Sequence, residues 1–314
     1  MDVNDLVFKE FVKNGYAKKD GNKLWDIAQR KFLYLTEEQS KSFLGLRKFD
    51  IYRKQIIDRE IDLIKEKASK IAEDIGDEPF NLVDIYCGDG TKACELIKFL
   101  GKDIKIRYCP VNVNEYLVNL ASENIKKEGF PNVVEVCPII SDGDPITLRN
   151  LEKKIKTKEF NRNVVLLLGT VLASYEINDY LFEISRNMKK NDYLLIGNGI
   201  RTGERLVEIE KYKSNPLKTW FIHLVKELGL EESDVEYDAQ FGNSRIEMFF
   251  RLKVDKIIEH NGKKVELKKG DEILTTVLYK YFEEEFDKFC KMYFSEICLA
   301  TDKDKGYALV LCKK

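Results

Sequence analysis

The stretch that most constrains the fold of this chain is residues 81–92, where an apolar run ends in a glycine turn. Leu82-Val83-Asp84-Ile85-Tyr86 indicates a buried strand, Gly88-Asp89-Gly90 a tight turn, and the apolar spacing over 93–100 a helix. Glycines let a ligand approach the backbone, and the start of a helix offers unpaired N–H groups. The stretch therefore predicts a site for a nucleotide-like ligand, with a plain strand-to-helix connection as the alternative.

After residue 80 the sequence alternates between strand and helix patterns. Val164-Val165-Leu166-Leu167-Leu168 is apolar without alternation, which is typical of a parallel strand buried on both faces. A helix over 282–293, followed by strands over 294–300 and 307–312, predicts an antiparallel hairpin at one sheet edge. We therefore predict an α/β fold with a doubly wound, Rossmann-like sheet and a terminal hairpin.

Two regions do not follow this alternation of strand and helix patterns. Residues 1–75 have helical apolar spacing with a turn at 15–21, and 201–255 ends in two segments that alternate like an antiparallel pair. We therefore expect a ligand-binding sheet domain of residues 66–200 and 256–314. Residues 1–65 and 201–255 are expected to form a smaller α+β cap domain that binds the substrate.

Composition excludes several classes of function. The 314 residues include 53 Lys and Arg against 54 Asp and Glu, so net charge favours neither nucleic acid nor an anionic membrane as a partner. No apolar run is long enough to span a membrane, and the N-terminus is unlike a signal peptide, which predicts a cytoplasmic protein. The seven cysteines show no CxxC pair and there are two histidines, so no metal site is expected.

The glycine turn must also be compared with other nucleotide motifs. Residues 88–93, Gly-Asp-Gly-Thr-Lys-Ala, satisfy the GxGxxA pattern of dinucleotide-binding folds. That pattern needs an acidic residue at the end of the second strand to hold a ribose hydroxyl, and this chain has Asn112 there. The GxxxxGK[ST] spacing of a P-loop is absent from the sequence.

The run Asp84-Ile-Tyr-Cys-Gly-Asp-Gly resembles the first motif of the Rossmann-like class I methyltransferases that use S-adenosylmethionine. That motif commonly reads acidic-Leu-Gly-Cys-Gly-x-Gly, and Asp84, Cys87, Gly88 and Gly90 fit it. Tyr86 stands in place of its first glycine. The resemblance therefore implies that Tyr86 crowds the methionine end of the cofactor or redirects it.

From about residue 25 to its end, the chain resembles the histidine-specific methyltransferase family. That family includes the ergothioneine-pathway histidine Nα-methyltransferases and the fungal dimethylallyltryptophan N-methyltransferases. The resemblance is carried by Tyr34-Leu35-Thr36, Lys92, Pro110-Val111-Asn112-Val113, Ser141-Asp142, Leu168-Gly169-Thr170, Arg245-Ile246-Glu247-Met248, 270–275 and 279–281.

The resemblance implies S-adenosyl-L-methionine as cofactor and S-adenosyl-L-homocysteine as product. It implies a cofactor site made of Asp84, Tyr86, Gly88, Asp89, Gly90, Lys92, Asn112, Ser141, Asp142 and Gly169. Asn112 would contact the ribose and Asp142 the adenine. The alternatives are that Asp142 starts a turn and that Lys92 is a solvated helix residue.

The substrate side departs from the family pattern. The family's histidine-reading asparagine falls on Ser174, and the glutamate and serine that hold the imidazole fall on Thr276 and Leu278. Each buried imidazole group left without its partner costs about 1–3 kcal/mol. Histidine is therefore not the expected substrate. Tyr34 and Tyr212 remain as polar contacts to an acceptor amine.

Methyl transfer from a sulfonium needs a neutral lone pair held in line with the methyl carbon, so positioning matters more than a strong base. We expect a monomeric N-methyltransferase that acts on a small amine or amino acid. Tyr34 and Ser174 would orient the nitrogen, beside Tyr212 and Thr276. Leu278, Met248 and Trp220 would supply an apolar wall, although Met248 and Trp220 are also explained by core packing.

Two alternative functions remain open. One is a methyltransferase that acts on a protein or on a non-nitrogen acceptor, and the other is a non-catalytic binding module.

Overall fold

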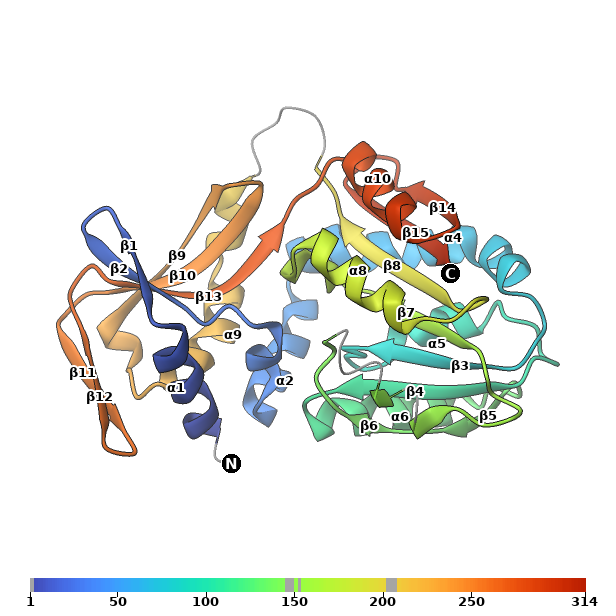
Figure 1. Ribbon diagram of the computed structural model, residues 1–314, viewed down its shortest axis with the longest axis horizontal. Helices are drawn as coiled ribbons and strands as arrows, with labels where there is room; N and C mark the ends of the chain where they lie inside the picture. The colour runs from blue at the N-terminus through green and yellow to red at the C-terminus, as the bar shows by residue number, and fades with distance from the viewer. Residues whose placement is uncertain (1–2, 145–149, 152–153, 202–207) are drawn as a thin grey trace. The chain divides into compact units, whose positions relative to one another are not determined.

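The computed structural model describes residues 3–144, 150–151, 154–201 and 208–314, which divide into two units (Figure 1). The small unit comprises Met1–Phe49 and Leu206–Tyr279, and the large unit comprises Asp50–Arg205 and Lys280–Lys314. Residues 50–65 therefore belong to the large unit and 256–279 to the small unit, unlike the predicted division of the chain.

The large unit is built on a mixed sheet. Its strands are β3 (Phe80–Ile85), β4 (Ile106–Asn112), β5 (Val133–Val136), β6 (Ile139–Ile140), β7 (Asn163–Leu167), β8 (Tyr193–Gly199), β14 (Glu296–Thr301) and β15 (Tyr307–Lys313). The described strands run in the order β14-β15-β8-β7-β3-β4-β5, with β6 paired to β4. The pairs from β8 through β7 and β3 to β4 and β5 are parallel, whereas β15 is antiparallel to both β8 and β14. The α/β fold and the terminal hairpin are thus confirmed.

Helices connect these strands. They are α3 (Asp50–Tyr52), a π-helical turn η3 (Arg53–Ile57), α4 (Asp58–Ile75), α5 (Thr91–Ile97), α6 (Glu115–Glu128), a 3₁₀ turn η4 (Leu172–Ser174), α8 (Ile177–Asn187) and α10 (Glu283–Tyr293). Helix α4 packs beside α5, and α8 packs beside α10 (Figure 1). Among the described residues, no helix is both long and apolar enough to cross a membrane.

Helix α4 belongs to the large unit because of one apolar stripe. Leu63, Ile64 and Ile71 recur at helical spacing and are buried in the same core cluster as Phe80 and Leu82 of β3. The helix ends at Gly76, whose φ of 72° suits a glycine after a helix. Burial of this stripe against the sheet explains why the unit boundary falls before α4 rather than after residue 65.

The small unit contains a second sheet. Its strands are β1 (Tyr16–Lys19), β2 (Asn22–Asp26), β9 (Val235–Gly242), β10 (Arg245–Leu252), β11 (Lys256–His260), β12 (Lys263–Leu267) and β13 (Glu272–Tyr279). The main sheet runs β1-β2-β13-β10-β9, and β11 and β12 form a separate hairpin. The expected antiparallel pair is β9 with β10. Because β13 pairs with β10 along its whole length, residues 272–279 belong to this unit.

The prediction that residues 1–75 are helical, apart from a turn at 15–21, was wrong at β1 and β2. These strands form an antiparallel hairpin around Asp20 and Gly21, whose φ values are 50° and 86°. An Asp-Gly pair with both residues at positive φ is a typical two-residue hairpin turn. Short, half-exposed strands of this kind carry little apolar pattern, and the turn dipeptide was their clearest signal.

The remaining described elements of the small unit are helical. They are α1 (Val3–Asn14), η1 (Arg30–Tyr34), α2 (Glu37–Gly45), η2 (Leu46–Lys48), η5 (Ile209–Lys213), α9 (Asn215–Lys226) and η6 (Glu232–Asp234). The start of α2 has a capping box. The Gln39 N–H donates to Thr36 Oγ1 at 3.2 Å, and the Thr36 N–H donates to Gln39 Oε1 at 2.9 Å.

Candidate functional site

The carboxyl ends of the parallel strands β3, β4 and β7 lie at one edge of the large unit's sheet. Strand β3 lies between the other two, so the chain runs to β4 on one side of it and to β7 on the other. Ligands of open α/β sheets bind at such a switch point. The predicted cofactor residues occupy these strand ends: Asp84 in β3, Tyr86, Gly88, Asp89, Gly90 and Lys92 after it, Asn112 ending β4, Ser141 and Asp142 after β6, and Gly169 after β7.

Two residues with a strained backbone lie at these strand ends. Tyr86 follows β3 with a φ of 53°, and Thr170 follows β7 with a φ of 60°. Side chains disfavour this left-handed region, most strongly when they are β-branched, as in threonine. The glycine turn is also tight, because a Cβ on Gly90 would lie 3.2 Å from the Ala121 backbone. Strained residues of this kind cluster at functional sites.

The positive φ of Tyr86 explains why a glycine suits this position, and its side chain fills space beside the loop after β6. The Tyr86 and Tyr175 hydroxyls lie 3.2 Å apart, and Tyr175 donates to Asp144 Oδ1 at 3.4 Å. A Cβ on Gly143 would lie 2.5 Å from the Tyr86 ring. The ring is thus held in place by neighbours from two loops, at the edge where the predicted cofactor residues lie.

Asp84 is buried at the end of β3 and accepts a hydrogen bond from the Tyr108 hydroxyl at 2.7 Å. Burial raises the pKa of Asp84 to about 7, although the hydrogen bond from Tyr108 and the positive charge of Lys92 oppose this shift. A carboxyl group with this pKa changes its charge near neutral pH. It can therefore respond to a cationic ligand bound nearby.

Asn112 ends β4 with its side chain only 1% exposed. Its Oδ1 accepts from the Asn114 N–H at 3.1 Å, which fixes the orientation of the amide. Its Nδ2 has no hydrogen-bond partner among the residues that the structure describes. Buried donors are seldom left unpaired, so this nitrogen is suited to an acceptor on a ligand. Ser141 is close by, because its N–H donates to the Asn112 carbonyl at 2.9 Å.

A residue that the sequence analysis missed joins this edge of the sheet. Glu60 of α4 is fully buried, and both carboxylate oxygens accept from the Gly169 N–H, at 2.8 and 3.0 Å. Glu60 also forms an ion pair with Lys92 and accepts from the Tyr307 hydroxyl at 2.7 Å. In the sequence, Glu60 could have been recognised as a charged residue at helical spacing from Ile57 and Ile64, which are both buried.

Three of the substrate-side residues predicted in the small unit lie on one face of its sheet. In the β10–β13 register, Met248 lies opposite Thr276 and Ile246 lies opposite Leu278, so Met248, Thr276 and Leu278 share that face. Tyr237 shares it too, being paired with Phe250, and its hydroxyl donates to the Tyr212 carbonyl at 2.7 Å. Ser174 lies in the large unit, at the end of η4.

Tyr34 lies in an aromatic cluster of the small unit. Its ring centroid is 5.2 Å from that of Phe43 and 5.6 Å from that of Trp220. The Trp220 Nε1 donates to the Leu33 carbonyl at 3.1 Å. Burial raises the pKa of the Tyr34 hydroxyl, which accepts from Arg30 at 3.4 Å. Tyr34 therefore stays protonated, and it can orient a partner but cannot act as a base.

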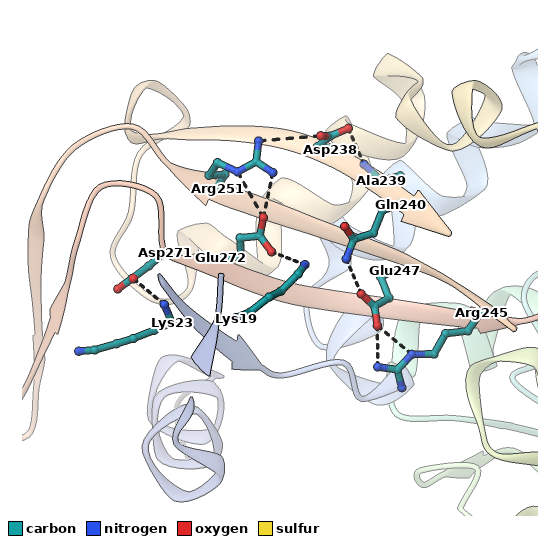
Figure 2. A network of polar contacts seen from close by, with 10 residues as sticks. All are labelled: Lys19, Lys23, Asp238, Ala239, Gln240, Arg245, Glu247, Arg251, Asp271 and Glu272. Carbon is teal, nitrogen blue, oxygen red and sulfur yellow. Dashed lines mark hydrogen bonds and ion pairs between the residues drawn. The ribbon is translucent and has the colours of Figure 1, made fainter. Parts of the chain in front are cut away.

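The opposite face of this sheet carries a network of charged side chains (Figure 2). Arg245 donates to Glu247 at 2.6 and 2.9 Å, and Gln240 donates to the same carboxylate at 2.7 Å. Burial raises the pKa of Glu247, but these hydrogen bonds outweigh that effect and lower it. A second group on the same face joins Lys19, Glu272, Arg251 and Asp238.

The raised pKa of Asp84 predicts a measurable effect of pH on stability. A group whose pKa is higher in the folded state stabilises the fold below its unfolded pKa and loses that effect as pH rises through about 7. Asp84→Asn mimics the neutral form. Relative to the unsubstituted protein, the variant should therefore gain roughly 3–4 kcal/mol in free energy of unfolding between pH 4 and pH 8. Denaturant titrations at each pH measure this difference, and a constant difference would contradict the assigned shift.

Comparison with known proteins supports the same region. A family model described as "Histidine-specific methyltransferase, SAM-dependent" matches residues 52–314. The match starts later than the predicted residue 25, so Tyr34-Leu35-Thr36 lies outside it and the role of Tyr34 remains a prediction. Among curated proteins, none matches the sequence.

Several solved structures are similar over most of the chain. A S-adenosylmethionine-dependent methyltransferase from Clostridium acetobutylicum ATCC 824 is 14% identical, with 87% of this chain and 98% of that chain covered and a TM-score of 0.45. The PH0226 protein from Pyrococcus horikoshii OT3 is 13% identical, with 89% and 100% covered and a TM-score of 0.46. Streptomyces venezuelae DesVI is 10% identical, with 88% and 98% covered and a TM-score of 0.40.

The family match extends from the start of the large unit to the end of the chain, and it includes every predicted cofactor residue. It confirms the enzyme class, and with it the cofactor, that the glycine turn and the motifs around it had indicated. This chain belongs to the histidine-specific, S-adenosylmethionine-dependent methyltransferase family, and it is a methyltransferase that uses S-adenosylmethionine.

Proposed function

We propose that this methyltransferase methylates the nitrogen of a small amine or amino acid other than histidine. The family description names histidine. The positions that the resemblance assigns to imidazole recognition, however, are Ser174, Thr276 and Leu278 in this chain. The observation that carries the proposal is the face formed by Met248, Thr276 and Leu278. This face offers one hydroxyl, from Thr276, and two apolar side chains. An imidazole would need a carboxylate at position 276 and a hydroxyl at position 278.

The nearby acidic residues do not replace the missing carboxylate. Glu247 lies opposite Val277 in the register, on the other sheet face, where Arg245 and Gln240 hold it. Glu272 pairs with Lys19 and Arg251 on that same face. An imidazole N–H bound at Thr276 would therefore lose a charged acceptor. Loss of such a buried partner costs about 1–3 kcal/mol, which is roughly a tenfold to hundredfold discrimination against histidine.

The strand-end residues of the large unit suit the cofactor. The Nδ2 of Asn112 is a buried donor, and a ribose hydroxyl would supply its acceptor. Lys92 offers a positive charge for an anionic group, and Asp84 can ionise to balance a cationic one. The glycines of the turn leave room for a ligand beside the backbone. We therefore assign the ten predicted cofactor residues to this site.

S-adenosylmethionine supplies an electrophilic methyl group on a sulfonium sulfur when it is bound. The chain's own residues then have to hold a neutral acceptor nitrogen and exclude water. Ser174 can accept the N–H of an amine, and Tyr34, which stays protonated, can donate to a carboxylate or hydroxyl on the acceptor. In this proposal the small unit is the substrate-binding domain, and Tyr212, Met248, Thr276 and Leu278 contact the acceptor.

The role of Asn112 can be tested by direct binding. Asn112→Leu removes the unpaired donor, and it should weaken S-adenosylmethionine binding by about tenfold to hundredfold, equivalent to about 1–3 kcal/mol. Asn112→Asp should retain most of the affinity, because a carboxylate accepts hydrogen bonds from ribose hydroxyls. Isothermal titration calorimetry provides the measurement.

Asn187→Ala is a matched control, because this half-buried amide lies near Asn163 and Asp192 at the amino ends of β7 and β8. The control should bind the cofactor as the unsubstituted protein does. Equal affinities for Asn112→Leu and the unsubstituted protein would remove Asn112 from the site.

The proposed acceptor class predicts a specific pattern of activity. In a labelled-methyl screen of amines and amino acids, at least one primary or secondary amine should be methylated with a kcat/KM well above that for histidine. The double variant Thr276→Glu with Leu278→Ser restores the missing carboxylate and hydroxyl. It should raise kcat/KM for histidine by about tenfold or more, because two buried partners return. Efficient methylation of histidine by the unsubstituted enzyme would overturn this proposal.

A further inference from the structure

The carboxylate of Glu60 is the best-connected buried charge at the strand ends of the large unit. Glu60 is fully buried in α4, yet the partners of its carboxylate come from three other segments. They are Lys92 in the first turn of α5, Gly169 after β7, and Tyr307 at the start of β15. A buried carboxylate is costly unless charge and hydrogen bonds compensate it. Here a cation, a backbone N–H and a hydroxyl all do so.

The surrounding backbone leaves space for this carboxylate. A Cβ on Gly197 of β8 would lie 1.7 Å from Glu60 Oε1, so no other residue fits there without moving the carboxylate. A Cβ on Gly169 would lie 2.7 Å from Lys92 Nζ, so the ammonium group lies directly against the turn after β7. The Thr170 N–H donates to the Gly197 carbonyl at 3.1 Å and ties these two segments together.

The positive charge of Lys92 needs a negatively charged partner at its position in α5. It lies in the first turn of α5, and the dipole of a helix opposes a positive charge at that end. Its side chain is 19% exposed, so the ammonium could otherwise turn towards solvent. The Glu60 carboxylate fixes the ammonium at the switch point and leaves its remaining N–H groups for a ligand, because an ammonium has three donors.

We propose that Glu60 is a positioning residue of the cofactor site, which holds Lys92 and the Gly169–Thr170 turn in the arrangement that binds S-adenosylmethionine. This inference rests on the proposed cofactor role of Lys92. Glu60 does not touch the cofactor itself. It acts through the Lys92 ammonium and the Gly169 N–H. Because glutamine at position 60 keeps an oxygen that can accept from the Gly169 N–H, the effect of Glu60→Gln on cofactor binding depends on Lys92.

A double-mutant cycle tests this dependence. Glu60→Gln keeps the side-chain shape but removes the charge, and it should weaken S-adenosylmethionine binding by about tenfold or more in calorimetry. In a Lys92→Met background the same substitution should change affinity by less than twofold, because the residue through which Glu60 acts is already absent. The double variant has no unpaired buried charge, which favours its folding.

Two controls separate positioning from loss of structure. Arg59→Gln alters the neighbouring residue on α4, whose ion pairs with Asp302 and Asp304 lie towards the surface, and it should leave affinity unchanged. In the cofactor-free protein, the rate at which an amine-reactive reagent modifies Lys92 should rise at least fivefold in Glu60→Gln. Lys98 pairs with Glu95 at the end of α5 and should keep its rate. Mass spectrometry of peptides follows both lysines.

The outcomes are distinct. A weakened affinity that disappears in the Lys92→Met background, with faster modification of Lys92 alone, supports the positioning role. Equal weakening in both backgrounds, or equal acceleration at Lys92 and Lys98, would show that Glu60 only maintains the fold. If the unsubstituted protein does not bind S-adenosylmethionine, the proposed cofactor site fails first, and this inference fails with it.

Discussion

One buried carboxylate constrains how the large unit is assembled. Glu60 must be matched by donors because it has no access to water, and those donors come from α5, the turn after β7, and β15. The requirement brings together segments that lie far apart in the sequence, at the edge where β3 and β7 end. It also accounts for glycine at position 197, where a side chain would displace the carboxylate.

The same edge of the sheet combines a strained backbone, buried side chains and an unpaired polar group. Tyr86 and Thr170 adopt positive φ values after the two central strands, and Asn112 carries a buried donor at the end of the third. Each of these features is unfavourable for stability taken alone. Together they are the features expected of a ligand-binding site. The family match across residues 52–314 shows that the enzyme uses S-adenosylmethionine, and we propose that this edge of the sheet binds it.

Much of the large unit could be predicted because its signals are local. The apolar run before Gly88 and the unbroken run at 164–168 each specify a buried parallel strand, and the glycine turn specifies where the chain approaches a ligand. Glu60 was missed because the sequence does not show that Lys92, Gly169 and Tyr307 lie next to it in the fold. Long-range pairing also decided the unit boundaries, since β13 follows its partner β10 rather than the strands that come after it.

The small unit was harder to predict for a related reason. The register between β10 and β13 decides which residues share a face, and an irregularity between Met248 and Phe249 shifts that register. The resulting register places Thr276 beside Met248, and Glu247 lies on the opposite, charged face of the sheet. Sequence alone identified Thr276 and Leu278 as changed positions, but only the pairing shows that Glu247 does not compensate for them.

We propose that the strand ends of the large unit bind S-adenosylmethionine through this arrangement of residues. A crystal structure with S-adenosylhomocysteine tests this proposal most directly. We expect a ribose hydroxyl within hydrogen-bonding distance of Asn112 Nδ2, an anionic group of the ligand at Lys92, and the Glu60–Lys92 pair intact beside them. A ligand bound elsewhere, or bound here with Asn112 Nδ2 still unpaired and Lys92 turned away, would contradict it.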